Sequence, residues 1–175
     1  AALSFYGDFE SSMNRVQALG NITGDALDRL KAQALDLGAK TKFSAKDAAD
    51  GMGELAAKGY TTEQIMRTIP GVLSLAAVES MSVADAAKIA SNAINQFGLD
   101  AGQAGHVADV LAAASSRTST NVTNLGQALE YAGPIAATAG MTLEQTAGAV
   151  ALLSQSGLEA QQAGTGLRGV IASLV

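Results

Sequence analysis

Two short stretches of the chain decide its fold: GYTTEQ at residues 59–64 and GMTLEQ at residues 140–145. In each, a glycine that can adopt a left-handed conformation ends one helix, and a threonine two residues later begins the next. The threonine oxygen accepts a hydrogen bond from a free amide of the new helix. The glutamine three residues further on accepts one from the threonine amide. Each stretch therefore predicts a sharp corner between two helices.

Residues suited to begin a helix recur along the chain at steps of 17 to 21 residues. The polar residues suited to begin a helix are Ser44, Thr61, Ser82, Asp100, Asn121 and Thr142. Alanine occupies 36 of the 175 positions and aromatic residues are few, so the intervening segments favour helix over strand. We therefore expect an all-α fold: an array or bundle of eight to nine short helices that pack through faces rich in Ala and Gly.

Two prolines and a polar run predict further breaks. Pro70 suits the first turn of a separate short helix, and Gly133-Pro134 predicts a kink or a break. The polar run at residues 115–120 predicts a loop, because hydroxyl side chains compete for helical hydrogen bonds. A step near 20 residues matches no standard two-helix repeat, so we interpret the similar stretches as repeated capping chemistry.

The domain organisation follows from where the capping pattern begins. We expect an N-terminal helical arm over residues 1–43 and a helical core region over residues 44–175. The chain starts at Ala1 without a methionine and stops at Val175 inside an apolar helix pattern. We therefore interpret it as a fragment of a longer chain.

Composition argues against several classes of function. The net charge of −5 and the pI near 4.7 disfavour binding to nucleic acid, which needs a basic surface. There is no cysteine, which excludes disulfides and thiolate metal sites. No run of about 18 uninterrupted apolar residues is present, the length needed to span a bilayer.

No residue pattern indicates catalysis. His106 and Asp109 could share a helix face, but two ligands are too few for a metal site. Gly51-Met52-Gly53 and Gly164-Thr165-Gly166 favour close helix packing, because neither follows a predicted strand as a phosphate-binding loop would. We therefore expect a protein that is not an enzyme, with no catalytic, cofactor-binding or metal-binding residue.

Methionines and two residues near helix starts remain as candidates for partner contacts. The five methionines either fill gaps in an alanine-rich core or form an adaptable surface, and we favour the core. Tyr60 and Met141 are expected to be exposed apolar residues near a helix start. The methionines are Met13, Met52, Met66, Met81 and Met141.

From about Phe9 to Leu174 the sequence resembles the core region of tail tape measure proteins of long-tailed bacteriophages and prophages. The order and spacing of the matching stretches are specific to that family. They are Phe9-Glu10 with Met13 and Val16; Leu37-Gly38 with Thr41, Phe43 and Ser44; Leu55-Ala56 with Gly59; Leu75-Ala76; Ala108-Asp109-Val110-Leu111; Gly133-Pro134 with Ala136; Gly140-Met141-Thr142; and Ala163-Gly164-Thr165 with Leu167-Arg168.

The resemblance implies a structural role in tail assembly and tail-length determination, with a part in genome ejection. Such proteins lie inside the tail tube of the virion after assembly in the bacterial cytoplasm. The implied partners are the tail-tube protein, tail assembly chaperones and copies of the chain itself, with transient contact to the host membrane. Nothing in the family implies an active site in this region.

Two other functions remain open from the residues alone. Small-residue helices can pack in lipid, as a membrane-active pore-forming protein or effector would need. A bacterial helical adaptor without a viral link would also fit.

Overall fold

A computed structural model describes residues 2–118 and 120–174, and side chains from residue 7 onward. All six predicted capping residues precede a helix, and the side chain of each accepts a hydrogen bond from a backbone amide of that helix. Four of them, Ser44, Thr61, Asp100 and Thr142, form complete capping boxes. The capping residues in the sequence thus mark where the helices begin.

The described residues form nine α-helices, one short 3₁₀ helix and no strand, which confirms the predicted all-α array. The helices are α1 (Ala2–Gly20), α2 (Asp25–Lys40), α3 (Ala45–Ala57), α4 (Thr62–Glu79), α5 (Val83–Phe97), η1 (Ala101–Gln103), α6 (Ala104–Ser116), α7 (Val122–Thr138), α8 (Leu143–Gln155) and α9 (Ala160–Leu174).

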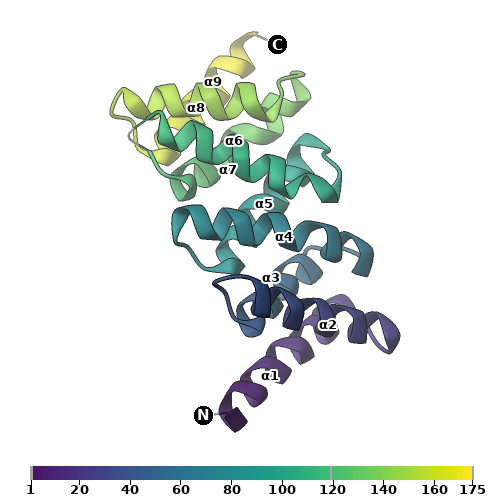
Figure 1. The fold of residues 1–175 in the computed structure, drawn as a ribbon. Helices are drawn as coiled ribbons and strands as arrows, with labels where there is room; N and C mark the ends of the chain where they lie inside the picture. Colours follow the sequence, from purple (N-terminus) through teal and green to yellow (C-terminus); the bar gives the residue numbers. More distant parts are fainter. Residues whose placement is uncertain (1, 119, 175) are drawn as a thin grey trace.

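The helices stack in two layers, with alternate helices in each. In one layer α1, α3, α5, α7 and α9 pack in succession, and in the other α2, α4, α6 and α8 do the same. The stack is elongated, and the two ends of the chain lie at its opposite ends (Figure 1). Such an arrangement of helix pairs is an α-solenoid.

The repeat unit is one helix pair. Along the odd layer the residues before α3, α5, α7 and α9 are 38 or 39 positions apart: Ser44, Ser82, Asn121 and Glu159. Two predicted steps of about 20 residues therefore make one two-helix repeat, and the capping boxes at Thr61 and Thr142 recur as part of it. GYTTEQ and GMTLEQ hold the same place in this repeat, since both begin helices of the even layer.

The predicted break at Pro70 was wrong, and at Pro134 the chain does not break, while a kink there stays a prediction. Pro70 lies inside α4 and Pro134 inside α7. A proline within a helix leaves the carbonyl four residues earlier without its amide partner. In α4 that carbonyl belongs to Met66, and the Gln33 side chain of α2 donates to it at 2.9 Å. The neighbouring helix thus supplies the hydrogen bond that Pro70 removes.

The predicted loop at residues 115–120 is shorter than expected. Helix α6 continues through Ser115 and Ser116, whose hydroxyls donate to carbonyls of their own helix. Ser119 lies outside the described residues.

The core runs the length of the stack and uses many small side chains. Its largest fully buried residues include Met13, Leu30, Met52, Leu55 and Ile65. Helices α1 and α2 pack on α3, and buried residues of both belong to the same cluster as the rest. The division into an arm over residues 1–43 and a core over residues 44–175 stays a prediction.

Candidate interaction surfaces

His106 lies beside Glu144, a pairing that no local sequence pattern indicates. Its Nε2 is 2.6 Å from Glu144 Oε1, so the pair bridges α6 and α8 across 38 residues of sequence. Asp109, the expected neighbour, is exposed. Hydrogen bonds from the Thr142 hydroxyl, the amide of Glu144 itself and His106 lower the pKa of the Glu144 carboxyl. The described part of the chain contains no group of three side chains that could hold a metal ion.

Tyr60 is buried, and the expectation that it forms an exposed contact was wrong. Only 7% of its surface is accessible, and its hydroxyl donates to Asn95 Oδ1 at 3.3 Å. Burial raises the pKa of this hydroxyl. Tyr60 is held against α5 because α3 and α5 are neighbours in the odd layer. Met141, the other candidate, is half-buried against the core.

The methionines belong to the core. Met13 and Met52 are fully buried, and Met66, Met81 and Met141 are partly buried against the core. This agrees with the interpretation that they fill gaps between small side chains.

In each glycine pair, only the first glycine lies at a close contact with a neighbouring helix. A Cβ built on Gly51 would lie 2.7 Å from Val83 of α5, and one on Gly164 would lie 2.5 Å from the carbonyl oxygen of Ala128 of α7. These two glycines permit close helix crossings, as predicted. A Cβ on Gly53 would be no nearer than 3.9 Å to Val16, and one on Gly166 would meet nothing within 4 Å.

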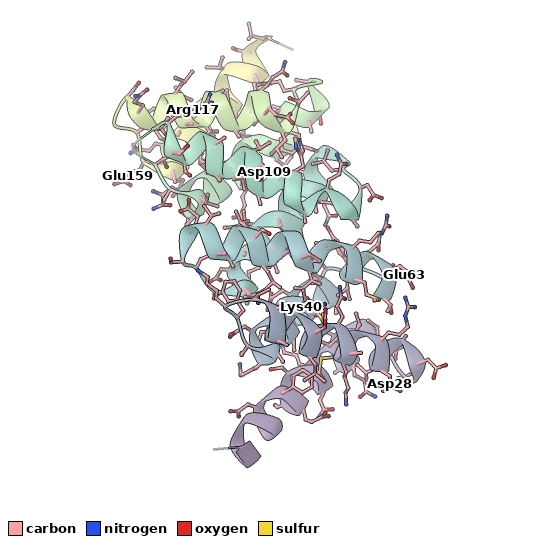
Figure 2. The ribbon with its side chains drawn as sticks, viewed as in Figure 1. Asp28, Lys40, Glu63, Asp109, Arg117 and Glu159 are labelled. Carbon is pink, nitrogen blue, oxygen red and sulfur yellow. The ribbon has the colours of Figure 1, made fainter. Side chains whose placement is uncertain are left out.

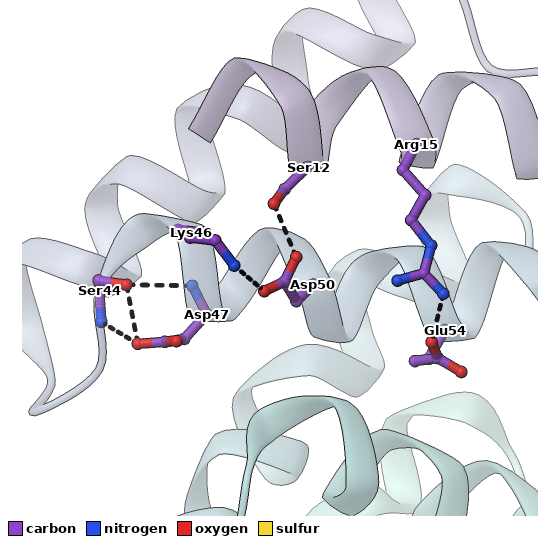
Figure 3. Close-up of polar contacts among 7 residues, drawn as sticks. All are labelled: Ser12, Arg15, Ser44, Lys46, Asp47, Asp50 and Glu54. Atoms are coloured by element: carbon purple, nitrogen blue, oxygen red, sulfur yellow. Dashed lines mark hydrogen bonds and ion pairs between the residues drawn. The ribbon is translucent and has the colours of Figure 1, made fainter. Parts of the chain in front are cut away.

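Polar contacts in the odd layer join some neighbouring repeats. Between α1 and α3, the Ser12 hydroxyl donates to Asp50 at 2.7 Å and Arg15 donates to Glu54 at 2.6 Å (Figure 3). Lys46 also pairs with Asp50. The Asp50 carboxylate therefore binds one side chain of its own helix α3 and one side chain of α1. Further along, Asn92 of α5 donates to Glu130 of α7 at 2.9 Å.

The even layer has a similar series of charged pairs. Arg29 of α2 pairs with Glu63 of α4 at 2.6 Å, and Arg67 of α4 pairs with Asp100 at 3.0 Å. These side chains are more than half exposed, so solvent screens each pair and its contribution to stability is small.

An apolar groove lies between α6 and α8. Its volume is about 430 Å³, and Val110, Ala114, Ala147, Ala151 and Leu152 are among the residues that line it. Leu152 is 64% exposed there. Sequence reasoning missed the groove, because it forms only when two helices 39 residues apart become neighbours.

Charged side chains are spread along the whole stack, as the labelled residues of Figure 2 show. Acidic and basic groups both occur from the N-terminal to the C-terminal end. The labelled residues are Asp28, Lys40, Glu63, Asp109, Arg117 and Glu159.

Within the described residues, no single helix is long and apolar enough to cross a bilayer. Helices α4 and α5 pass that test only together, as a pair bent by 118°.

Comparison with known proteins gives a consistent family. Residues 31–175 match the family model described as phage-related minor tail protein. The chain is 42% identical over 174 residues to the tape measure protein of Pneumococcus phage Dp-1, which covers 99% of this chain and 15% of that relative. No solved structure matches. The resemblance to tape measure proteins is thereby confirmed, and the chain belongs to the family of phage-related minor tail proteins.

Proposed function

We propose that this chain is a structural, non-enzymatic segment of a tail tape measure protein that helps to set tail length. The observation that supports this most directly is the 42% identity to a tape measure protein along almost the entire chain. The proposal includes a place in the lumen of the tail tube, after assembly in the bacterial cytoplasm. Tail-tube subunits, assembly chaperones and further copies of the chain are its proposed partners, and assistance to genome ejection its later role.

The solenoid makes the ruler role a quantitative question. A helix pair advances the stack by roughly the 8–10 Å between packed helices. The same residues as one continuous helix would span about 1.5 Å each, or about 58 Å for a repeat of 39 residues. A ruler that works by extended length therefore requires the solenoid to open when the tube forms around it.

The repeat offers a deletion that removes length without cutting a helix. Removal of residues 82–120 joins Met81 directly to Asn121, so that α4 is followed by the intact cap of α7. The shortened chain keeps alternate layers, and its circular dichroism should remain helical. The deletion is made in the gene that encodes this chain, and tail length is measured by electron microscopy.

We expect tails shorter by about 58 Å, the extended length of the deleted repeat. A control is Thr68→Val, which weakens packing at a buried hydrogen bond but leaves the chain length unchanged. It should leave tail length unchanged. Tails of normal length after the deletion would overturn the ruler role of this segment. Shortening by only about 10 Å would mean that the segment contributes as a folded solenoid.

The other functions considered for the sequence have less support. The similarity to tail proteins supports neither a pore-forming protein nor an adaptor outside phages. The arm over residues 1–43 and the core over residues 44–175 stay in the proposal as separately deletable parts.

A further inference from the structure

Equivalent positions in the odd layer face the next repeat. The seventh residue after the one that precedes each helix is Gly51 in α3, Ile89 in α5 and Ala128 in α7. Each of these touches the following odd helix: Gly51 lies against Val83 of α5, Ile89 against Gly126 of α7, and Ala128 against Gly164 of α9. This position is thus the place where one repeat seats the next.

In α9 the same position is Gly166, and no helix of the described residues packs against it. A Cβ built there would meet no atom within 4 Å. The eleventh position shows the same change. Leu55 of α3, Ala93 of α5 and Ala132 of α7 are buried, with 0%, 2% and 0% of their surface exposed, whereas Val170 of α9 is 57% exposed.

The exposed side of α9 is also free of charge at these positions. We call Gly166, Gly169, Val170 and Ser173 the open face of α9; all four are exposed. Gly169, like Gly166, has no atom within 4 Å of an added Cβ.

The opposite end of the stack differs in chemistry. On α1 the exposed stripe includes Asp8, Ser11 and Asn14, which are polar. In solenoid proteins a polar outer face marks a terminal repeat, while an apolar one needs a neighbour. A second copy stacked head to tail would therefore set a polar face against the open face of α9.

We propose that the open face of α9 seats a further odd-layer helix of the same polypeptide, an amphipathic helix with a small residue at the crossing. Gly126 and Gly164 show what that crossing requires, since each admits the side chain or backbone of the preceding odd helix. The chain spans only 15% of its tape measure relative, so the longer polypeptide has room for such a repeat. The inference holds whether or not the segment sets tail length.

The absence of cysteine in this chain allows a direct test by labelling. Val170→Cys is made both in the 175-residue chain and in the protein from the complete gene, each purified alone. The rate of maleimide labelling at position 170 itself is measured by peptide mass spectrometry, so that thiols elsewhere do not contribute. An exposed control is Val78→Cys, at a residue 61% exposed on α4. A buried control is Ala132→Cys, the equivalent of Val170 in α7.

We expect Cys at position 170 to label as fast as Cys at position 78 in the 175-residue chain, and at least tenfold more slowly in the complete protein. Cys at position 78 should label rapidly in both proteins and Cys at position 132 slowly in both. Equal labelling of position 170 in the two proteins would overturn the proposal. Protection that grows with concentration of the 175-residue chain would also overturn it, because a second copy would then cover the face.

A variant without a new thiol gives an independent measurement. Val170→Glu should lower the thermal midpoint of the complete protein while leaving that of the 175-residue chain unchanged. The matched variant Val78→Glu should change neither. A Val170→Glu protein that melts like the wild type in both lengths would contradict a buried role for this face.

Discussion

Gly71→Ala tests the close crossing of α4 and α6, on which the even layer depends. A Cβ on Gly71 would lie 2.5 Å from the carbonyl carbon of Ala104 and closer still to the amide nitrogen of Gly105. Both are backbone atoms near the start of α6, so they cannot turn aside as a flexible side chain would. Relief of the clash requires the two helices to separate.

The expected magnitude is a balance of two effects. Overpacking of this kind costs about 1–3 kcal/mol. Replacement of glycine by alanine inside a helix returns about 1 kcal/mol in helix propensity. Gly148→Ala in α8 is the matched control, because a Cβ there would meet nothing within 4 Å and only the propensity gain applies. The two variants should therefore differ by about 1–3 kcal/mol, the full cost of overpacking.

The assay is thermal and urea unfolding of the 175-residue chain, followed by circular dichroism. For a chain of this size 1 kcal/mol moves the midpoint by about 2–4 °C. Gly71→Ala should melt below Gly148→Ala by roughly 2–12 °C. If Gly71→Ala proves as stable as Gly148→Ala, the helices do not cross as closely as described and the reasoning fails.

Three further predictions concern single contacts. Thr68→Val should cost about 1–3 kcal/mol in unfolding experiments, because the fully buried hydroxyl donates to the Ala101 carbonyl at 2.8 Å, whereas Thr138→Val on an exposed surface should change little. Thr61→Ala should cost about 1 kcal/mol through loss of the α4 cap, and an equal loss in its neighbour Thr62→Ala would refute the capping role. Because the pKa of Glu144 is lowered by folding, its contribution is present above the ordinary carboxyl pKa near 4.5 and is lost as the pH falls through the lowered value. Unfolding curves of Glu144→Gln should therefore approach those of the wild type at acid pH, and a difference independent of pH would contradict this.

The helix boundaries were predictable because they depend on local chemistry. A threonine and a glutamine three residues apart make a capping box with no help from the rest of the fold, and Thr61 and Thr142 do so. The continuity of α4 through Pro70 and the burial of Tyr60 depend instead on distant partners. Gln33 rescues the carbonyl freed by Pro70, and Asn95 receives the Tyr60 hydroxyl. Neither partner is visible in a local pattern.

The two-layer arrangement could have been recognised from the same caps taken two at a time. Ser44, Ser82 and Asn121 are 38 and 39 residues apart, a regular spacing that the intervening even-layer caps obscure. The groove between α6 and α8 could not, because it depends on how far apart two helices of one layer lie. In an alanine-rich chain that distance is set by a few glycines, such as Gly71, whose neighbours are known only in the structure.

Within the described residues, each helix makes its main contacts with helices no more than two places away in the chain. Under tension along the polypeptide, the interfaces between repeats would therefore bear the load in series, and the weakest would yield first. Repeats would then be released one by one, in steps of about 39 residues, because most contacts join only neighbouring repeats. The same short-range connectivity would allow a released repeat to return to place without waiting for the rest of the molecule.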